Sequence, residues 1–137
     1  MIKIRQFNIT DIDNISAQQE QKFETGLYEP SPKQEPYTIF DDETNMIIAI
    51  LIFTELTEER FAISSLISAD AGKYFVSLRE IVFKFIDEYY AVPRLECVVH
   101  TSFTQGHRLM KLLGFKKEAD MKKFFKGETY SLYARIK

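Results

Sequence analysis

The spacing of hydrophobic and polar residues changes along the chain, and the middle of the sequence has the spacing of strands. Residues 46–53 are apolar without interruption, and residues 61–67 alternate with a period of two. A strand with no polar face has to be covered on both sides, so we expect residues 46–54 at the centre of a sheet. A short strand at 37–40 and a polar turn at 41–45 precede it. Together these segments predict a three-stranded antiparallel meander.

Two helices are indicated by apolar residues three and four positions apart, and a third by a capping signal. After an extended start at residues 2–7, Thr10 resembles an N-cap, which predicts a first helix from there to about Phe23. The longest helix is predicted at 71–90, and a shorter one is predicted before Gly114. The strand between these two, at 95–99, makes a parallel strand-helix-strand crossover the expected connection. The stripe on the longest helix comprises Phe75, Leu78, Val82, Phe85, Ile86 and Tyr89.

The remaining segments predict a proline-rich loop and a closing hairpin. The loop runs from Gly26 to Pro36 and contains three prolines, which disfavour both helix and sheet. The hairpin pairs 121–125 with 130–136 around a turn at 126–128, where Gly127 permits a positive φ. The resulting order is β-α-β-β-β-α-β-α-β-β. Without internal repeats or a long linker, this order predicts one domain spanning residues 1–137.

Composition narrows the classes of protein and site. The chain has 137 residues, of which 45% are hydrophobic and 28% charged, which is enough for a buried core and a solvated surface. The net charge of −2 provides no global basic field for nucleic acid. The single Cys97 excludes an internal disulfide, and the longest apolar run is too short to cross a bilayer, so we expect a soluble protein in a reducing, cytoplasmic compartment. Two histidines and one cysteine do not provide the ligand set of a zinc site, so no metal is expected.

One stretch of the sequence resembles a known superfamily. The strand at 95–99 is followed by Thr101-Ser102-Phe103-Thr104, a compact helix and Leu113-Gly114-Phe115, and the chain closes on Tyr130-Ser131-Leu132-Tyr133. Together with the element order, this resembles the GNAT (GCN5-related N-acetyltransferase) superfamily. The resemblance implies an α/β (α+β) domain with a mixed, mostly antiparallel sheet of about seven strands and helices on both faces. Residues 74–115 are also similar to small acetyltransferase-like proteins of short-tailed bacteriophages, some of them internal virion or head-assembly proteins.

The resemblance implies acetyl-CoA as a possible cofactor, with its phosphates at the start of the longest helix. The family pattern there is Arg/Gln-x-x-Gly-x-Gly/Ala, whereas this chain has Ser68-Ala69-Asp70-Ala71-Gly72-Lys73. The leading Arg or Gln is missing and only one glycine is present. Asp70 is also expected to cap the helix itself, which would occupy donors that an anion needs. The candidate cofactor-binding residues are Ser68, Ala71, Gly72 and Lys73.

No catalytic residue can be assigned from the family pattern. The positions that match the usual Asn and the thiolate-protonating Tyr hold Phe103 and Met110, and a thioether cannot donate a proton. Residues 61–67 contain no acid that could serve as a base. We expect His107 to be a solvated residue of a surface helix. The nearest carboxylates are Glu20, Glu24, Glu55, Glu58 and Glu59, all of them unassigned.

The sequence contains residues of two other kinds of site. Serines and histidines can be combined into a hydrolase triad in many ways, but no Gly-x-Ser-x-Gly elbow is present, so hydrolase chemistry is discounted. The lysines at 116–126 flank Phe124 and Phe125. This is the one local patch that could bind a polyanion or an acidic partner. Strand alternation predicts phenylalanines inside and lysines outside without any ligand, so a nucleic-acid-associated module ranks last and we expect no nucleic acid partner. The lysines concerned are Lys116, Lys117, Lys122, Lys123 and Lys126.

These features predict a non-catalytic GNAT-like protein that acts by binding. The expected partners are other proteins, either virion components or a second copy of the chain, with no membrane association. An exposed strand edge in an opened sheet would suit such contacts. The expected location is the host cytoplasm or the virion. The alternative is a divergent, active N-acetyltransferase that acts on an amine, with acetyl-CoA held by the 68–73 amides and water as the acid.

Overall fold

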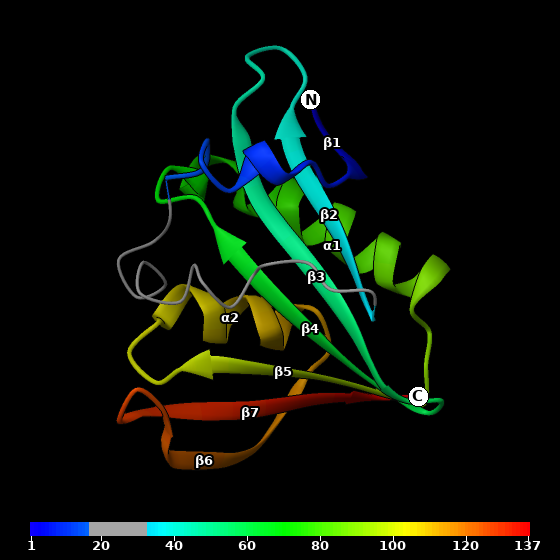
Figure 1. Ribbon diagram of the computed structural model, residues 1–137, viewed down its shortest axis with the longest axis vertical. Helices are drawn as coiled ribbons and strands as arrows, with labels where there is room; N and C mark the ends of the chain where they lie inside the picture. Colours follow the sequence, from blue (N-terminus) through cyan, green and yellow to red (C-terminus); the bar gives the residue numbers. More distant parts are fainter. Residues whose placement is uncertain (17–32) are drawn as a thin grey trace. The chain divides into compact units, whose positions relative to one another are not determined.

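The computed structural model describes residues 1–16 and 33–137. Within these residues the sheet has seven strands in the order β1-β2-β3-β4-β5-β7-β6, so β7 lies between β5 and β6 (Figure 1). The α+β fold class and the mixed sheet are therefore confirmed. The elements are β1 (Ile2–Gln6), a 3-10 helix (Ile9–Asp11), β2 (Gln34–Asp41), β3 (Ile47–Thr57), β4 (Arg60–Ile67), a 3-10 helix (Ala71–Tyr74), α1 (Phe75–Tyr89), β5 (Arg94–His100), α2 (Thr104–Leu112), β6 (Lys116–Phe125) and β7 (Glu128–Ile136).

The strand pairings combine antiparallel neighbours with one parallel pair. The pairs β1–β2, β2–β3, β5–β7 and β6–β7 are antiparallel. β4 and β5 run parallel and are paired from Arg60 opposite Arg94 to Ala62 opposite Glu96. Because α1 connects these two strands, the predicted parallel crossover is confirmed. β6 ends the strand order on its side and is therefore an edge strand.

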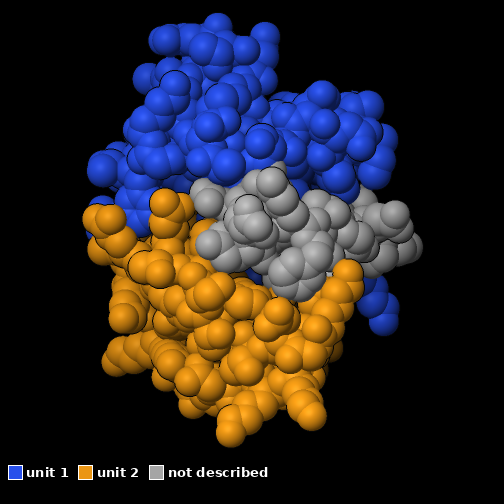
Figure 2. Space-filling model, turned by 90° about the vertical axis from the view of Figure 1, so that its left-hand side faces the viewer, with its two compact units in different colours: residues 1–54, 63–81 blue, residues 55–62, 82–137 orange. Residues whose placement is uncertain are grey.

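The contacts divide the chain into two compact units, which are coloured separately in Figure 2. Unit 1 comprises residues 1–54 and 63–81, and unit 2 comprises residues 55–62 and 82–137. The boundary passes through β3, β4 and α1 rather than through a linker. The single domain over 1–137 stays a prediction.

The core of unit 1 is built on the apolar β3 strand. Residues 47–53 are all buried, and β3 has β2 and β4 as neighbours, which confirms its predicted central position. Burial of a side chain such as Ile50 or Leu66 stabilises the fold by roughly 1.5–3 kcal/mol. The cluster around them contains Ile47, Ile50, Ile52 and Leu66, with Phe7, Ile12 and Ile15 packed against it.

The first predicted helix differs from the structure. The N-cap is Asn8 rather than Thr10, and the described part contains only a 3-10 helix at Ile9–Asp11. Asn8 has extended backbone dihedrals, its Oδ1 accepts from the Thr10 amide at 3.2 Å, and Asp11 completes a capping box. Thr10 was wrong as a cap because the suitable polar residue two positions earlier occupies that role. The rest of the predicted helix, together with most of the proline loop, lies outside the described residues.

The second strand begins earlier than predicted and includes a proline. β2 starts at Gln34, so Pro36, which was predicted in the loop, lies within the strand opposite Ile52. β1 pairs only with Tyr37 to Asp41, so the missing amide of Pro36 falls beyond the paired length of β1. The carbonyl of Pro36 still accepts from the Phe7 amide at 3.3 Å.

The closing hairpin is confirmed, with a longer first strand than predicted. Lys126 and Gly127 have φ values of 50° and 78°, the combination that a tight hairpin turn requires. β6 begins at Lys116 rather than Met121, and its pairing with β7 shifts register twice. Within residues 1–16 and 33–137, no helix is both long enough and apolar enough to cross a bilayer.

Candidate functional site

The segment between β4 and α1 uses its backbone donors internally. The Ser68 amide donates to the Ile48 carbonyl at 2.8 Å, and the Ala69 amide donates to the Ser16 carbonyl at 2.5 Å. The Asp70 amide donates to Ser68 Oγ, and the Ala71 amide donates to the Ser68 carbonyl, both at 3.1 Å. A phosphate-binding loop offers such amides to its ligand. In this chain four successive amides already have protein acceptors.

The four predicted cofactor-binding residues lie in this one turn but differ in exposure. Ser68 is 2% exposed and Ala71 is 4% exposed, so both side chains belong to the interior. Gly72 and Lys73 are exposed, and a Cβ built on Gly72 would meet no atom within 4 Å. Lys73 Nζ lies over the Tyr74 ring, 5.1 Å from its centroid. The cofactor role of these four residues stays a prediction.

The predicted cap by Asp70 is wrong. Asp70 stands at the N-cap position, but its side chain makes no capping hydrogen bond. Its φ and ψ of −96° and 11° are not the extended values of a capping residue. Ser68 provides the side-chain acceptor instead. A hydrogen bond from Tyr74 to Asp41, 2.6 Å long, also holds the start of the helix and lowers the pKa of the Asp41 carboxyl.

The positions that match the family's polar groups are apolar and buried in unit 2. Phe103 and Met110 are each 5% exposed, and Phe103 precedes α2 without a side-chain cap. Neither residue can donate a proton. Phe103 and Met110 are therefore core residues of unit 2.

His107 is hydrogen-bonded at both ring nitrogens, so the prediction that it is solvated was wrong. Its Nε2 lies 3.1 Å from the His100 carbonyl and 3.0 Å from the Thr101 carbonyl, and its Nδ1 lies 2.8 Å from the Tyr133 hydroxyl. Because carbonyls only accept, Nε2 carries the proton in the neutral ring. Nδ1 then accepts from Tyr133. The ring connects α2, the end of β5 and β7.

Tyr133 belongs to the closing motif of the sequence, but its contact with His107 was not predicted. It is 1% exposed and lies opposite Cys97 in the register of β5 and β7, and burial raises the pKa of its hydroxyl. Tyr133 therefore stays protonated at neutral pH and donates to His107. Residues 107 and 133 are far apart in sequence, and only the position of β7 beside β5 brings them together.

A second histidine orders the turn between β5 and α2. His100 Nδ1 accepts from the Ser102 amide at 3.1 Å and lies 2.8 Å from the Ser102 hydroxyl, while Nε2 lies 3.7 Å from Glu128. This is a Ser-His-Glu row. The amide and the hydroxyl of Ser102 share the one lone pair of His100 Nδ1, so this contact stabilises the turn between β5 and α2. It provides no separate argument for hydrolase chemistry.

The described carboxylates near β4 are either exposed or held by arginines. Glu55, Glu58 and Glu59 are exposed, and Glu20 and Glu24 lie outside the described residues. Glu96 lies between two arginines. Its hydrogen bond with Arg60 lowers the pKa of Glu96 and outweighs the opposite effect of burial. Arg94 Nε donates to the same carboxylate at 2.6 Å, so this group is ionised and engaged.

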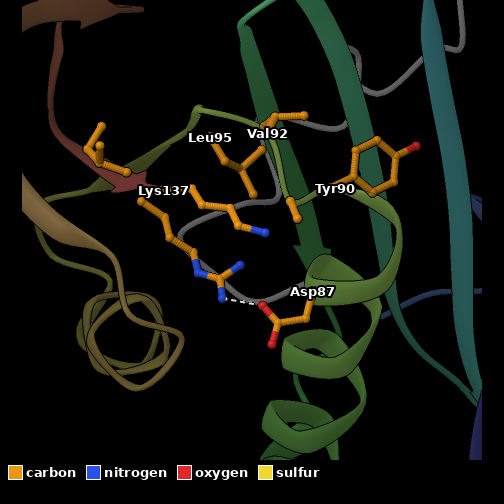
Figure 3. A pocket seen from close by; sticks show the side chains of 8 residues that line it. Asp87, Tyr90, Val92, Leu95 and Lys137 are labelled. Carbon is orange, nitrogen blue, oxygen red and sulfur yellow. Dashed lines mark hydrogen bonds and ion pairs between the residues drawn. The ribbon is translucent and has the colours of Figure 1, made fainter.

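A cavity of about 110 Å³ lies in unit 2, where the end of α1 and the connection to β5 meet the end of β7 (Figure 3). Its charged wall is largely neutralised, because Arg135 Nη2 lies 2.6 Å from Asp87 Oδ1. None of the predicted site residues lines it. The lining residues are Asp87, Tyr90, Ala91, Val92, Leu95, Arg135, Ile136 and Lys137. In the part of the chain that the structure describes, no group of three or more His, Cys, Asp or Glu side chains could hold a metal ion.

The strand order and the parallel crossover define a GNAT-like fold. Solved acetyltransferase structures share it over nearly their full length. A chimera of spermidine N-acetyltransferase SpeG from Vibrio cholerae and hSSAT matches with a TM-score of 0.73 and 13% identity, covering 98% of this chain and 95% of its own. A GNAT-family acetyltransferase from Bacillus anthracis matches with a TM-score of 0.69 and 15% identity, covering 98% and 94%.

A third structure, ribosomal-protein-S5-alanine acetyltransferase from Vibrio fischeri, has a TM-score of 0.69 and 12% identity, covering 98% of this chain and 92% of its own. No family model and no curated protein matches the sequence. At these identities the likeness establishes the fold alone.

Proposed function

We propose that this GNAT-fold chain is a non-catalytic binding protein whose partners are other proteins. The observation that carries the proposal is the use of the four successive amides from Ser68 to Ala71 within the chain. A CoA pyrophosphate would need those donors, and each would have to exchange a protein acceptor for a phosphate oxygen.

The described residues also lack the polar side chains that acetyltransferases usually place at these positions. Phe103 and Met110 fill the positions of the family's polar side chains with buried apolar ones. Glu96 is held by two arginines, and the other described carboxylates near β4 are exposed. These features together support a role in binding other proteins rather than in acetyl transfer.

The resemblance of residues 74–115 to acetyltransferase-like phage proteins supports a role in virion assembly. On this proposal the chain acts in the host cytoplasm and in the particle. Its partners are virion proteins or a second copy of the chain.

Calorimetric titration with acetyl-CoA, with a thermal-shift control, tests the proposal. Ligand that binds the folded state has to raise the apparent stability by mass action. We expect neither heat nor a shift at millimolar ligand. Micromolar binding that is lost in Lys73→Glu but kept in Lys84→Glu would overturn the proposal, because both substitutions reverse an exposed charge and only the first lies in the predicted cofactor turn.

A divergent N-acetyltransferase is the second candidate, and one observation favours it. Gly72 and Lys73 are exposed at the start of the helix, and the Asp70 side chain makes no capping bond there. On this alternative these two residues bind phosphate, strand backbone polarises the thioester and water supplies the proton. Release of the CoA thiol on incubation of acetyl-CoA with spermidine or other amines would establish it. Absence of release above the uncatalysed rate would exclude it for the amines tested.

A further inference from the structure

The charges of this chain are unevenly distributed along the sequence. Residues 82–137 contain eleven Lys and Arg against six Asp and Glu, whereas residues 1–81 contain seven against fourteen. The net charge of −2 therefore conceals a basic C-terminal part. A local basic surface attracts polyanions even where the whole chain is weakly acidic.

Part of this surplus lies on the edge strand β6, which has four lysines and two acids. Its two acids are already engaged: Glu118 with Arg94 at 3.0 Å, and Asp120 with Lys117 at 3.0 Å. These contacts lower the pKa of both carboxyls, the Ser131 hydrogen bond being the main cause for Asp120. The other lysines of the strand are exposed, and among the described residues none has a carboxylate within ion-pair distance. They are Lys116, Lys122 and Lys123.

An exposed aromatic ring follows these lysines directly. Phe124 is 49% exposed, so the prediction that both phenylalanines of this strand face the core is wrong for Phe124. The cause is a break in the pairing of β6 with β7 between Met121 and Phe125, where Lys123 has a φ of 53°. A bulge of this kind redirects the side chains that follow it.

The Phe124 ring is held from behind by other aromatic residues. It lies 5.6 Å from the Tyr130 ring, which is 3% exposed and also contacts Phe125 at 6.4 Å and His100 at 5.2 Å. Lys126 Nζ lies 5.3 Å from the centroid of the Phe125 ring. The exposed ring is therefore a supported aromatic surface beside unneutralised lysines.

We propose that β6 binds single-stranded nucleic acid, with a base stacked on Phe124 and phosphates bound by Lys122 and Lys123. Every base has a π-face that can stack on such a ring, and the lysines compensate the backbone charge. An acidic peptide would use the lysines but would have no need of an exposed ring. The inference is independent of the proposed protein-binding function and replaces the expectation that nucleic acid is no partner.

Fluorescence anisotropy with a labelled oligothymidylate of about 16 nucleotides, measured over a salt series, tests this proposal. We expect binding at low salt that weakens as salt rises. Phe124→Ala should weaken it at least about fivefold, which is the smallest effect expected for one stacked base. Lys122→Gln and Lys123→Asn should each reduce the slope of log affinity against log salt by about 0.7. Asparagine is used at position 123 because it tolerates a positive φ.

Matched variants separate stacking from folding and from charge alone. Phe83→Ala and Lys84→Gln alter an exposed phenylalanine and an exposed lysine on α1 and should leave the affinity unchanged. Phe124→Tyr should retain binding, and Phe124→Leu should lose it while melting at the same temperature as Phe124→Tyr. The proposal would be overturned by no binding at low salt, by equal affinity for polyglutamate, or by a Phe124→Leu protein that binds as tightly as the wild type.

Discussion

The Tyr133 hydroxyl donates a hydrogen bond of 2.8 Å to His107 Nδ1 and so connects β7 with α2. The other nitrogen of the same ring donates to carbonyls at the end of β5. One imidazole thus uses both nitrogens to fix three neighbouring segments of unit 2.

Tyr133→Phe should lower the free energy of unfolding by about 1–3 kcal/mol, because Nδ1 of the half-buried His107 then lacks its partner. Urea denaturation followed by circular dichroism measures the change. Tyr89→Phe is the control: Tyr89 is 66% exposed, so removal of its hydroxyl should change stability by less than about 0.5 kcal/mol. Equal losses in the two variants would contradict the role assigned to His107.

Asp11 should make unit 1 sensitive to acid. Burial alone would raise the pKa of Asp11, but hydrogen bonds from Arg5, Thr38 and the Asn8 amide lower it overall. A group with a lowered folded-state pKa stabilises the protein above its unfolded pKa of about 3.9, and this stabilisation is lost as pH falls through the folded-state pKa.

Asp11→Asn should therefore lower the free energy of unfolding at neutral pH by about 1.5–3 kcal/mol, the usual range for a hydrogen bond to a charged group. It should also flatten the decline of stability toward acid pH. The exposed Asp13 provides the matched variant Asp13→Asn, which should leave the pH profile unchanged. If the stability of Asp11→Asn declined toward acid pH as steeply as that of the wild type, other carboxylates would control the acid sensitivity.

Gly106→Ala should destabilise the packing of α2 on β5. A Cβ at this position would lie 2.7 Å from Phe103 Cδ2 and 2.8 Å from Val99 Cγ1, both closer than real contacts allow. We expect a loss of about 1–3 kcal/mol in unfolding free energy, even though alanine is the better helix former. Gly72→Ala, where the added carbon meets nothing within 4 Å, should leave stability unchanged or raise it by up to about 1 kcal/mol. The opposite ranking of the two melting temperatures would refute the packing argument.

Ser68, rather than Asp70, provides the side-chain acceptor at the start of the long helix, and two alanine substitutions test this assignment. Ser68→Ala removes the acceptor of the Asp70 amide and should cost about 1 kcal/mol, the usual effect of losing a cap. Asp70→Ala removes a side chain that makes no capping bond and should have little effect. Thermal unfolding of both variants decides the matter, and a larger loss in Asp70→Ala would restore Asp70 as the cap.

Local patterns predicted the elements well because each depends on near neighbours in sequence. The uninterrupted apolar run placed β3 at the centre of the sheet, and the helix between two apolar strands predicted a parallel crossover. Gly127 marked the hairpin turn because few other residues adopt its φ of 78°. Boundaries were less secure, as with Asn8 and Thr10, where two suitable caps lie two residues apart.

The sequence could not predict contacts that depend on strand order and on irregular backbone. Because β7 lies between β5 and β6, Tyr133 comes opposite Cys97 and within reach of His107, a neighbourhood that no spacing reveals. The exposure of Phe124 has a similar origin, since strict alternation fails where β6 bulges. Residues 68–73 lie between β4 and α1, but the acceptors of their amides could not be foreseen, and their cofactor role stays a prediction.

The bulge and the lysines of β6 also affect how this edge of the sheet can pair with other molecules. An edge strand that is flat and apolar is a template on which strands of neighbouring molecules can grow into aggregates. The left-handed residue at Lys123 interrupts the row of edge hydrogen-bonding groups, and like charges on successive molecules repel one another. The same bulge that exposes an aromatic ring therefore makes this edge a poor template for a strand of a neighbouring molecule.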